Sequence, residues 1–226
     1  MWEKIGSILD AARERTLGAL LNGLAEAKTR RDQSTFSIAL IALSAKLAKA
    51  DGVVTDDEVA AFKDFFNFPQ GERRKVEMVY SLAQQDVAGF DHYLKQVAKL
   101  YEEEPAVLED VLDCLFHIAA ADGVAHPQEL AMLEEAAAVF GIAPGCFARI
   151  KAAHLGLEAE DPLFILGLPP EADQAAIRAR YRDLARLHHP DALVARGVPE
   201  HLSKIAEGRM AAVNEAYQRA LERVSA

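Results

Sequence analysis

Apolar residues recur every three or four positions along most of this chain, and the strict alternation typical of half-buried strands is absent. In the first two thirds, runs with helical spacing lie at 38–47, 62–68, 72–85, 91–102, 107–118 and 130–140. Near the C-terminus, Ile177, Tyr181, Leu184 and His188 fall on one face of a helix at 176–188. A second helical pattern contains Met210, Val213 and Tyr217. The sequence therefore predicts an all-α fold.

An internal repeat links two parts of the helical region. Residues 47–59 (LAKADGVVTDDEV) and 118–130 (IAAADGVAHPQEL) are offset by 71 positions and share six of thirteen residues. Each copy follows one apolar helix pattern and precedes another. We therefore expect a helical bundle with an internal pseudo-twofold, whose Asp-Gly turns end the first helix of each pair.

The helix at 176–188 carries two different faces and ends at a proline. Arg178, Arg182 and Arg186 are spaced by four and form a basic stripe away from the apolar face. Pro190 ends the helix, because proline lacks an N–H and forces the preceding residue out of the α region. The pattern predicts a rigid corner, His189-Pro190-Asp191, that displays an imidazole and a carboxylate. His188 lies on the apolar face, and we interpret it as a packed histidine.

These residues resemble a J domain, the module that binds DnaK-type chaperones. The resemblance runs from Asp161 to about Arg223. It includes a short first helix beginning at Asp161-Pro162-Leu163-Phe164, the pattern of Ile177, Tyr181 and Leu184, the His-Pro-Asp tripeptide, and the segment from Met210 to Tyr217. Ala192 and Asp183 depart from the basic residues common at these positions. The implied fold is an antiparallel helical hairpin in which Ile177, Tyr181 and Leu184 face Met210, Val213 and Tyr217.

The resemblance implies a partner and a set of contact residues. The partner is a DnaK-type heat-shock chaperone whose ATP hydrolysis becomes faster on binding. The chaperone-binding residues are His189, Pro190, Asp191, Arg178, Arg182, Arg186 and Tyr181. The basic stripe would orient the encounter, and Asp191 would accept a directional arginine contact.

The repeat region resembles a TerB domain, an all-helical module, from roughly Phe36 to His154. A TerB domain followed by a J domain is the order found in DjlA-type co-chaperones. We therefore expect three parts: an N-terminal amphipathic helix at 1–30, a TerB-like bundle at 31–155 and a J domain at 161–226. Our hypothesis is that the TerB-like domain selects an unknown client protein or a location.

Acidic residues of the two repeats suggest an alternative. Asp51, Glu58, Asp122 and Glu129 are related by the repeat and could converge around a divalent cation such as Ca²⁺. The other interpretation is structural: Glu58 and Glu129 cap helices, and Pro127 occupies a first helical position. If the TerB-like domain binds a cation, the protein would be a metal or stress sensor whose J domain passes the signal to a chaperone. Otherwise no cofactor is expected.

Charge and cysteine usage limit the remaining classes. The net charge is −10, and residues 161–226 hold 9 basic and 9 acidic residues, so the whole excess lies in 1–160. An acidic first domain disfavours nucleic acid and anionic lipid as partners. Cys114 and Cys146 form no paired motif, which fits a reducing cytoplasm. No phosphate-binding loop, HExxH motif or nucleophile triad spacing occurs, so an enzyme is not expected.

No membrane-spanning segment is expected from the sequence. The longest charge-free run in the N-terminal region is Gln33–Ala45, shorter than the roughly 20 residues that span a bilayer. No signal-peptide pattern is seen. The helix at 1–30 carries both signs of charge, and three placements remain open: packing on the bundle, self-association into a homodimer, or peripheral contact with the inner face of the membrane.

Overall fold

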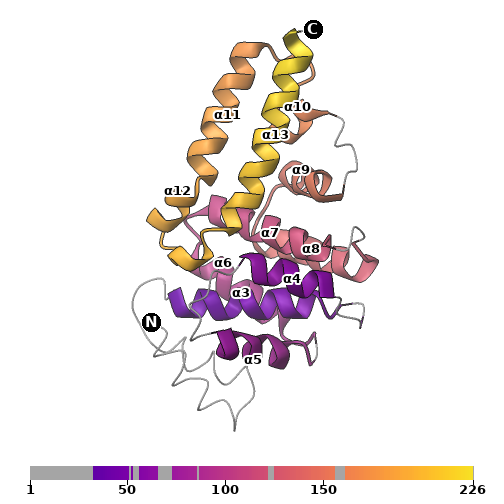
Figure 1. Ribbon diagram of the computed structural model, residues 1–226, viewed down its shortest axis with the longest axis vertical. Coiled ribbons are helices and arrows are strands. Elements are labelled where there is room, and N and C mark those ends of the chain that lie inside the picture. The colour runs from indigo at the N-terminus through magenta and orange to yellow at the C-terminus, as the bar shows by residue number, and fades with distance from the viewer. Residues whose placement is uncertain are drawn as a thin grey trace.

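The computed structural model describes residues 33–50, 52, 56–65, 73–85, 87–121, 125–155 and 161–225. The amphipathic helix expected at 1–30 lies outside these residues. No strand occurs within the described ranges, and the prediction of an all-α fold is confirmed. Figure 1 shows a bundle of helices from which a two-helix hairpin projects. Across the described residues, no helix combines the length and the apolar character needed to cross a bilayer.

The described part of the bundle begins with helix α3 and is built around two buried helices. Its members are α3 (Gln33–Leu47), α4 (Asp56–Phe65), α5 (Arg73–Ala83), α6 (Phe90–Leu100), α7 (Pro105–Ala119), α8 (Pro127–Val139) and α9 (Pro144–Leu155). Helix α3 packs against α5, α6 and α7, and α7 packs against α4, α8 and α9. This explains why both helices are apolar on nearly every face: residues 35–48 are all buried, as are most residues of α7. Each fully buried Leu side chain stabilises the fold by about 1.5–3 kcal/mol.

The first copy of the repeat has a left-handed glycine in the turn that follows the buried helix α3. Gly52 adopts φ +91°, a left-handed conformation that glycine reaches without strain, five residues after α3 ends at Leu47. In the second copy, Pro127 begins α8, and the His126 backbone N–H donates to the Glu129 carboxylate at 2.8 Å. Helix α9 has no counterpart in the predicted set of helices. Its sequence contains several small residues and only a weak apolar periodicity, so the spacing of apolar residues did not predict a helix there.

The remaining described helices form the hairpin and its surroundings: α10 (Pro162–Leu166), α11 (Gln174–His188), α12 (Pro190–Ala195), the short 3₁₀ helix η1 (Glu200–Leu202) and α13 (Ile205–Ser225). Helices α11 and α13 pack along each other through Ile177, Leu184, Val213, Ala216 and Ala220. Met210 is half-buried but lies outside this apolar cluster.

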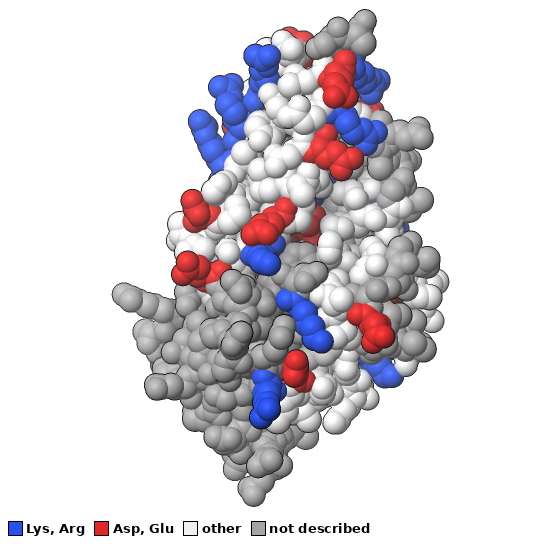
Figure 2. Space-filling view, in the orientation of Figure 1, with Lys and Arg blue, Asp and Glu red and all other residues white. Residues whose placement is uncertain are grey.

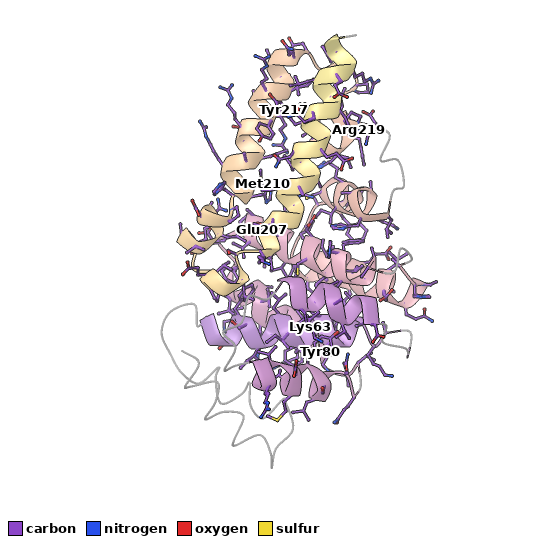
Figure 3. All side chains as sticks on the ribbon, in the orientation of Figure 1. Lys63, Tyr80, Glu207, Met210, Tyr217 and Arg219 are labelled. Atoms are coloured by element: carbon purple, nitrogen blue, oxygen red, sulfur yellow. The ribbon has the colours of Figure 1, made fainter. Side chains whose placement is uncertain are left out.

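Two tyrosines join the middle of the hairpin. The rings of Tyr181 and Tyr217 stack with centroids 4.1 Å apart, and the Tyr181 hydroxyl donates to Asn214 Oδ1 at 3.0 Å. Figure 3 shows Tyr217 on α13, between the two long helices. Stacked aromatic pairs add about 0.5–1.5 kcal/mol beyond their buried area, so this pair helps to fix the register of the hairpin.

The closed end of the hairpin is built into the first domain. Five side chains that follow the His-Pro-Asp tripeptide are completely buried and belong to the same apolar cluster as the bundle core: Leu193, Val198, Leu202, Ile205 and Ala206. Helix α13 also packs against α7. The corner between α11 and α12 therefore lies at the junction with the bundle, and the opposite end of the hairpin projects away from it (Figure 1).

Candidate functional site

The corner after α11 has a defined backbone conformation. His189 is extended, with φ −66° and ψ 138°, so α11 ends at His188. Pro190 then occupies the first turn of α12, where its fixed φ suits a helix and its missing N–H costs nothing. His189 serves as the N-cap of α12, because its Nδ1 accepts the Asp191 backbone N–H at 3.2 Å. The tripeptide therefore ends one helix and begins the next.

The side chains of the corner face solvent. The His189 side chain is 54% exposed and that of Asp191 is 94% exposed, with His189 Nδ1 3.6 Å from Asp191 Oδ2. The predicted exposed bend is present. In the segment after it, Gly197 and Pro199 favour a loop between the two long helices, but Pro190 starts a short helix there, and Leu193 anchors that helix in the core.

The basic stripe of α11 is exposed along its length. Arg178, Arg182 and Arg186 are all accessible, and basic side chains follow the outer edge of the hairpin in Figure 2. Arg180, which is not part of the stripe, turns the other way and donates from Nε to the Leu166 carbonyl at 2.9 Å. Tyr181 is half-buried by its stack, so only part of its surface is available to a partner.

Directly behind the corner lies a second histidine–aspartate pair, which is completely buried. His188 Nδ1 is 2.7 Å from Asp110 Oδ1 on α7, and both side chains are 0% exposed. The prediction that His188 is a packed histidine is confirmed. Its partner, however, belongs to the first domain. When Asp110 is ionised, Nδ1 must carry a hydrogen, and the Nδ1–H group donates a hydrogen bond to the carboxylate.

Further charged groups surround this pair at the junction. Arg209 of α13, 5% exposed, lies 3.6 Å from Asp113 and 3.8 Å from Glu109, both on α7. His154 of α9 lies 3.2 Å from Asp113. The junction thus joins three carboxylates of α7 to cationic or ionisable groups from α9, α11 and α13.

The pKa values of two of these carboxyl groups shift in opposite directions, although burial acts to raise both. Burial raises the pKa of Asp110 to about 6, although the His188 hydrogen bond opposes the rise. Burial also acts to raise the pKa of Asp113, but the nearby His154, Arg209 and His188 outweigh it, and the pKa lies below the ordinary value of 3.8. Asp113 has more favourable partners, which accounts for the difference.

Sequence reasoning did not find this junction. A signal was present: Asp110 and Asp113 are spaced by three in a helix that is otherwise almost entirely apolar. Charged residues are almost never fully buried without a partner, so these two aspartates indicate that basic side chains from other helices pack against them. Which groups supply them depends on how the hairpin docks, and no local pattern encodes that.

The cation hypothesis stays a prediction. Glu129 is 2% exposed, and its carboxylate accepts the N–H of His126 at the start of α8, as the capping interpretation expects. Glu58 lies on α4, and Asp51 and Asp122 lie outside the described residues. Within the described ranges, no group of three or more His, Cys, Asp or Glu side chains is arranged to hold a metal ion.

Two family models match the chain in the order seen in the structure. The model described as Tellurite resistance protein TerB matches residues 37–152, which is 116 of the 226 residues. The model described as DnaJ domain matches residues 161–221. The first match covers α3 to α9, and the second covers α10 to α13 with the His-Pro-Asp corner. No solved structure matches the chain.

Curated relatives align over most of the chain. Co-chaperone protein DjlA of Escherichia coli (strain K12) is 24% identical over 240 residues, covering 95% of this chain and 86% of the relative. The protein of that name from Vibrio parahaemolyticus is 25% identical, covering 82% of this chain and 76% of the relative. The protein of that name from Coxiella burnetii is 26% identical, covering 76% of this chain and 71% of the relative. The chain therefore belongs to the TerB family, with a DnaJ domain behind its TerB domain in the architecture of DjlA-type proteins.

Proposed function

We propose that this protein is a co-chaperone that binds a DnaK-type chaperone through the His189-Pro190-Asp191 corner and accelerates its ATP hydrolysis. The observation that carries the proposal is the corner itself. It is an exposed, proline-fixed turn at the end of a basic helix, inside a matched DnaJ domain. The relatives named co-chaperone protein DjlA support the same function.

Binding would proceed in two physical steps. The exposed stripe of Arg178, Arg182 and Arg186 attracts and orients an acidic surface of the chaperone, which mainly raises the association rate. Asp191, at 94% exposure, then accepts a charge-assisted and directional hydrogen bond. Because Pro190 already fixes the turn, little conformational entropy is lost when the corner docks.

The chemistry itself belongs to the partner. ATP would be hydrolysed in the chaperone's own site, and the role of this chain is to favour the conformation in which hydrolysis is fast. We assign the TerB domain the selection of a client protein or of a location.

The test is the steady-state ATPase rate of a DnaK-type chaperone with the full-length protein added. Wild-type protein should raise the rate severalfold, and His189→Gln should remove the increase. Arg219→Gln, on the far part of α13, is the control and should stimulate as well as wild type. A chaperone rate that wild-type protein leaves unchanged rules out the proposed function.

A further inference from the structure

The chaperone-facing corner is bracketed by two side chains attached to the first domain. On one side, His188 is bound to Asp110 of α7 at 2.7 Å, with both groups fully buried. On the other side, Arg196 lies 3.3 Å from Glu104, which directly precedes α7. Arg196 also donates to the Leu187 carbonyl, at the end of α11. The corner, His189-Pro190-Asp191, lies between these two attachments.

The segment after the corner is held by the same domain. Leu193 of α12 is 0% exposed within the bundle's apolar cluster, and the Tyr101 hydroxyl donates to the Gly197 carbonyl at 3.3 Å. Val198 and Leu202 are also completely buried there. The direction of α12, and with it the direction of Asp191, therefore depends on contacts made outside the hairpin.

The corner has little internal support of its own. Its own side-chain contacts are a 3.2 Å hydrogen bond from the Asp191 N–H to His189 Nδ1 and a 3.6 Å approach of the two exposed side chains. Exposed contacts of this kind contribute little in water, whereas a buried contact that loses one partner leaves an unsatisfied polar group. The buried attachments are thus the stronger constraint on the corner.

We propose that Asp110 and His188 are positioning residues for the chaperone-binding corner, and that the TerB domain is the clamp that holds the corner in its binding conformation. The inference rests on the proposed function for the identity of the partner. The clamp itself is a property of this chain and can be measured with no partner present.

Hydrogen exchange in the full-length protein tests the clamp. The probes are the backbone amides of Ala192, Leu193 and Val198, which are hydrogen-bonded to His189 and Leu193 carbonyls. In Asp110→Ala they should exchange about tenfold faster than in wild type, because His188 loses its partner. The reference is the Ile177 amide, which is bonded to the Asp173 carbonyl at the far end of the hairpin and should not change.

Two more variants separate positioning from general loss of stability. Asp110→Asn keeps an acceptor oxygen for His188 and should restore slow exchange. Val79→Ala removes core volume from α5, on the side of the bundle away from the hairpin (Figure 1), and should not accelerate the corner amides relative to Ile177. If Asp110→Ala does not fold, Arg196→Gln replaces it, since it cuts the other attachment.

Equal acceleration at Ile177 and at the corner, or no acceleration at all, would overturn the clamp. The chaperone ATPase assay gives a second measurement. If the binding conformation of the corner is only partly populated, more protein is needed to reach the same ATPase rate. Asp110→Ala should raise the half-maximal concentration about three- to tenfold and leave the plateau ATPase rate unchanged. An unchanged half-maximal concentration contradicts the inference. If wild-type protein fails to stimulate, only the proposed function fails, and the exchange result still decides the clamp.

Discussion

Two histidine–aspartate pairs lie back to back at the junction, and they differ in almost every physical respect. His189 and Asp191 are 54% and 94% exposed and 3.6 Å apart. His188 and Asp110 are 0% exposed and 2.7 Å apart, and they connect two domains. Under the proposed function, the same two residue types serve recognition on one side of the backbone and attachment on the other.

Solvent accounts for the difference. An exposed pair interacts weakly in water, so its groups stay available for a partner at little cost to stability. A buried pair has lost its hydration and depends on its hydrogen bond, so removing one member is costly. Substitutions on the outer side should therefore change binding, and substitutions on the inner side should change stability and the ordering of the corner.

The largest contrast in stability is expected between neighbouring residues of α12. Leu193→Ala should lower the free energy of unfolding by about 2–5 kcal/mol, because Leu193 is 0% exposed in the core of the first domain. Val194→Ala should change it by less than about 0.5 kcal/mol, since Val194 is 39% exposed. Urea unfolding of the full-length protein measures both. Equal losses would mean that α12 is not anchored as described.

The buried pair should give stability a pH dependence that Asp110→Asn removes. Burial raises the pKa of Asp110 from 3.8 to about 6 in the folded chain, with His188, Asp113 and Arg209 as its ionisable neighbours. The folded chain binds this proton more tightly, so the stabilisation is complete below about pH 4 and is lost as pH rises through about 6.

Between pH 4 and pH 7, the free energy of unfolding of wild type should therefore fall by up to about 3 kcal/mol relative to that of Asp110→Asn. Asp113 does not interfere, because its lowered pKa places its own effect below this range. Urea unfolding at a series of pH values gives the comparison. A constant difference between the two proteins at all pH values would contradict the assigned environment of Asp110.

On the exposed side, Asp191→Asn should weaken chaperone binding by about 2 kcal/mol, roughly 30-fold, because it removes the charge from a directional contact. Its free energy of unfolding should stay within about 0.5 kcal/mol of wild type. Calorimetric titration with the chaperone and urea unfolding supply the two numbers. A variant that binds normally would remove Asp191 from the interface.

The smallest effect is expected from the basic stripe. Arg182→Gln should weaken binding by about 0.2–1 kcal/mol at low salt, and the difference should fade near 1 M salt, where charges are screened beyond about 3 Å. The Asp110→Asn difference in stability should survive the same salt, since that group is buried. If salt leaves the Arg182→Gln difference intact, the stripe does not act through long-range charge.

The sequence predicted what depends on local pattern. Apolar spacing located most helices, Pro190 marked the end of α11, and the Asp-Gly repeat marked the turn at Gly52. It also placed His189 and Asp191 at an exposed corner. It did not reveal α12, whose formation depends on the burial of Leu193, nor the pairing of His188 with Asp110, which lies 78 residues away. Both depend on how the hairpin docks on the bundle.

Two adjacent histidines are assigned separate roles, His189 in binding the chaperone and His188 in attaching the hairpin, and one pair of matched substitutions tests this directly. His189→Phe should abolish stimulation of the chaperone ATPase and leave the unfolding free energy within about 0.5 kcal/mol of wild type. His188→Phe should lower that free energy by about 3 kcal/mol, because Asp110 is left buried without its partner, while the plateau ATPase rate is retained. If the two variants behave alike in both measurements, the outward and inward histidines do not have separate roles and the account is wrong.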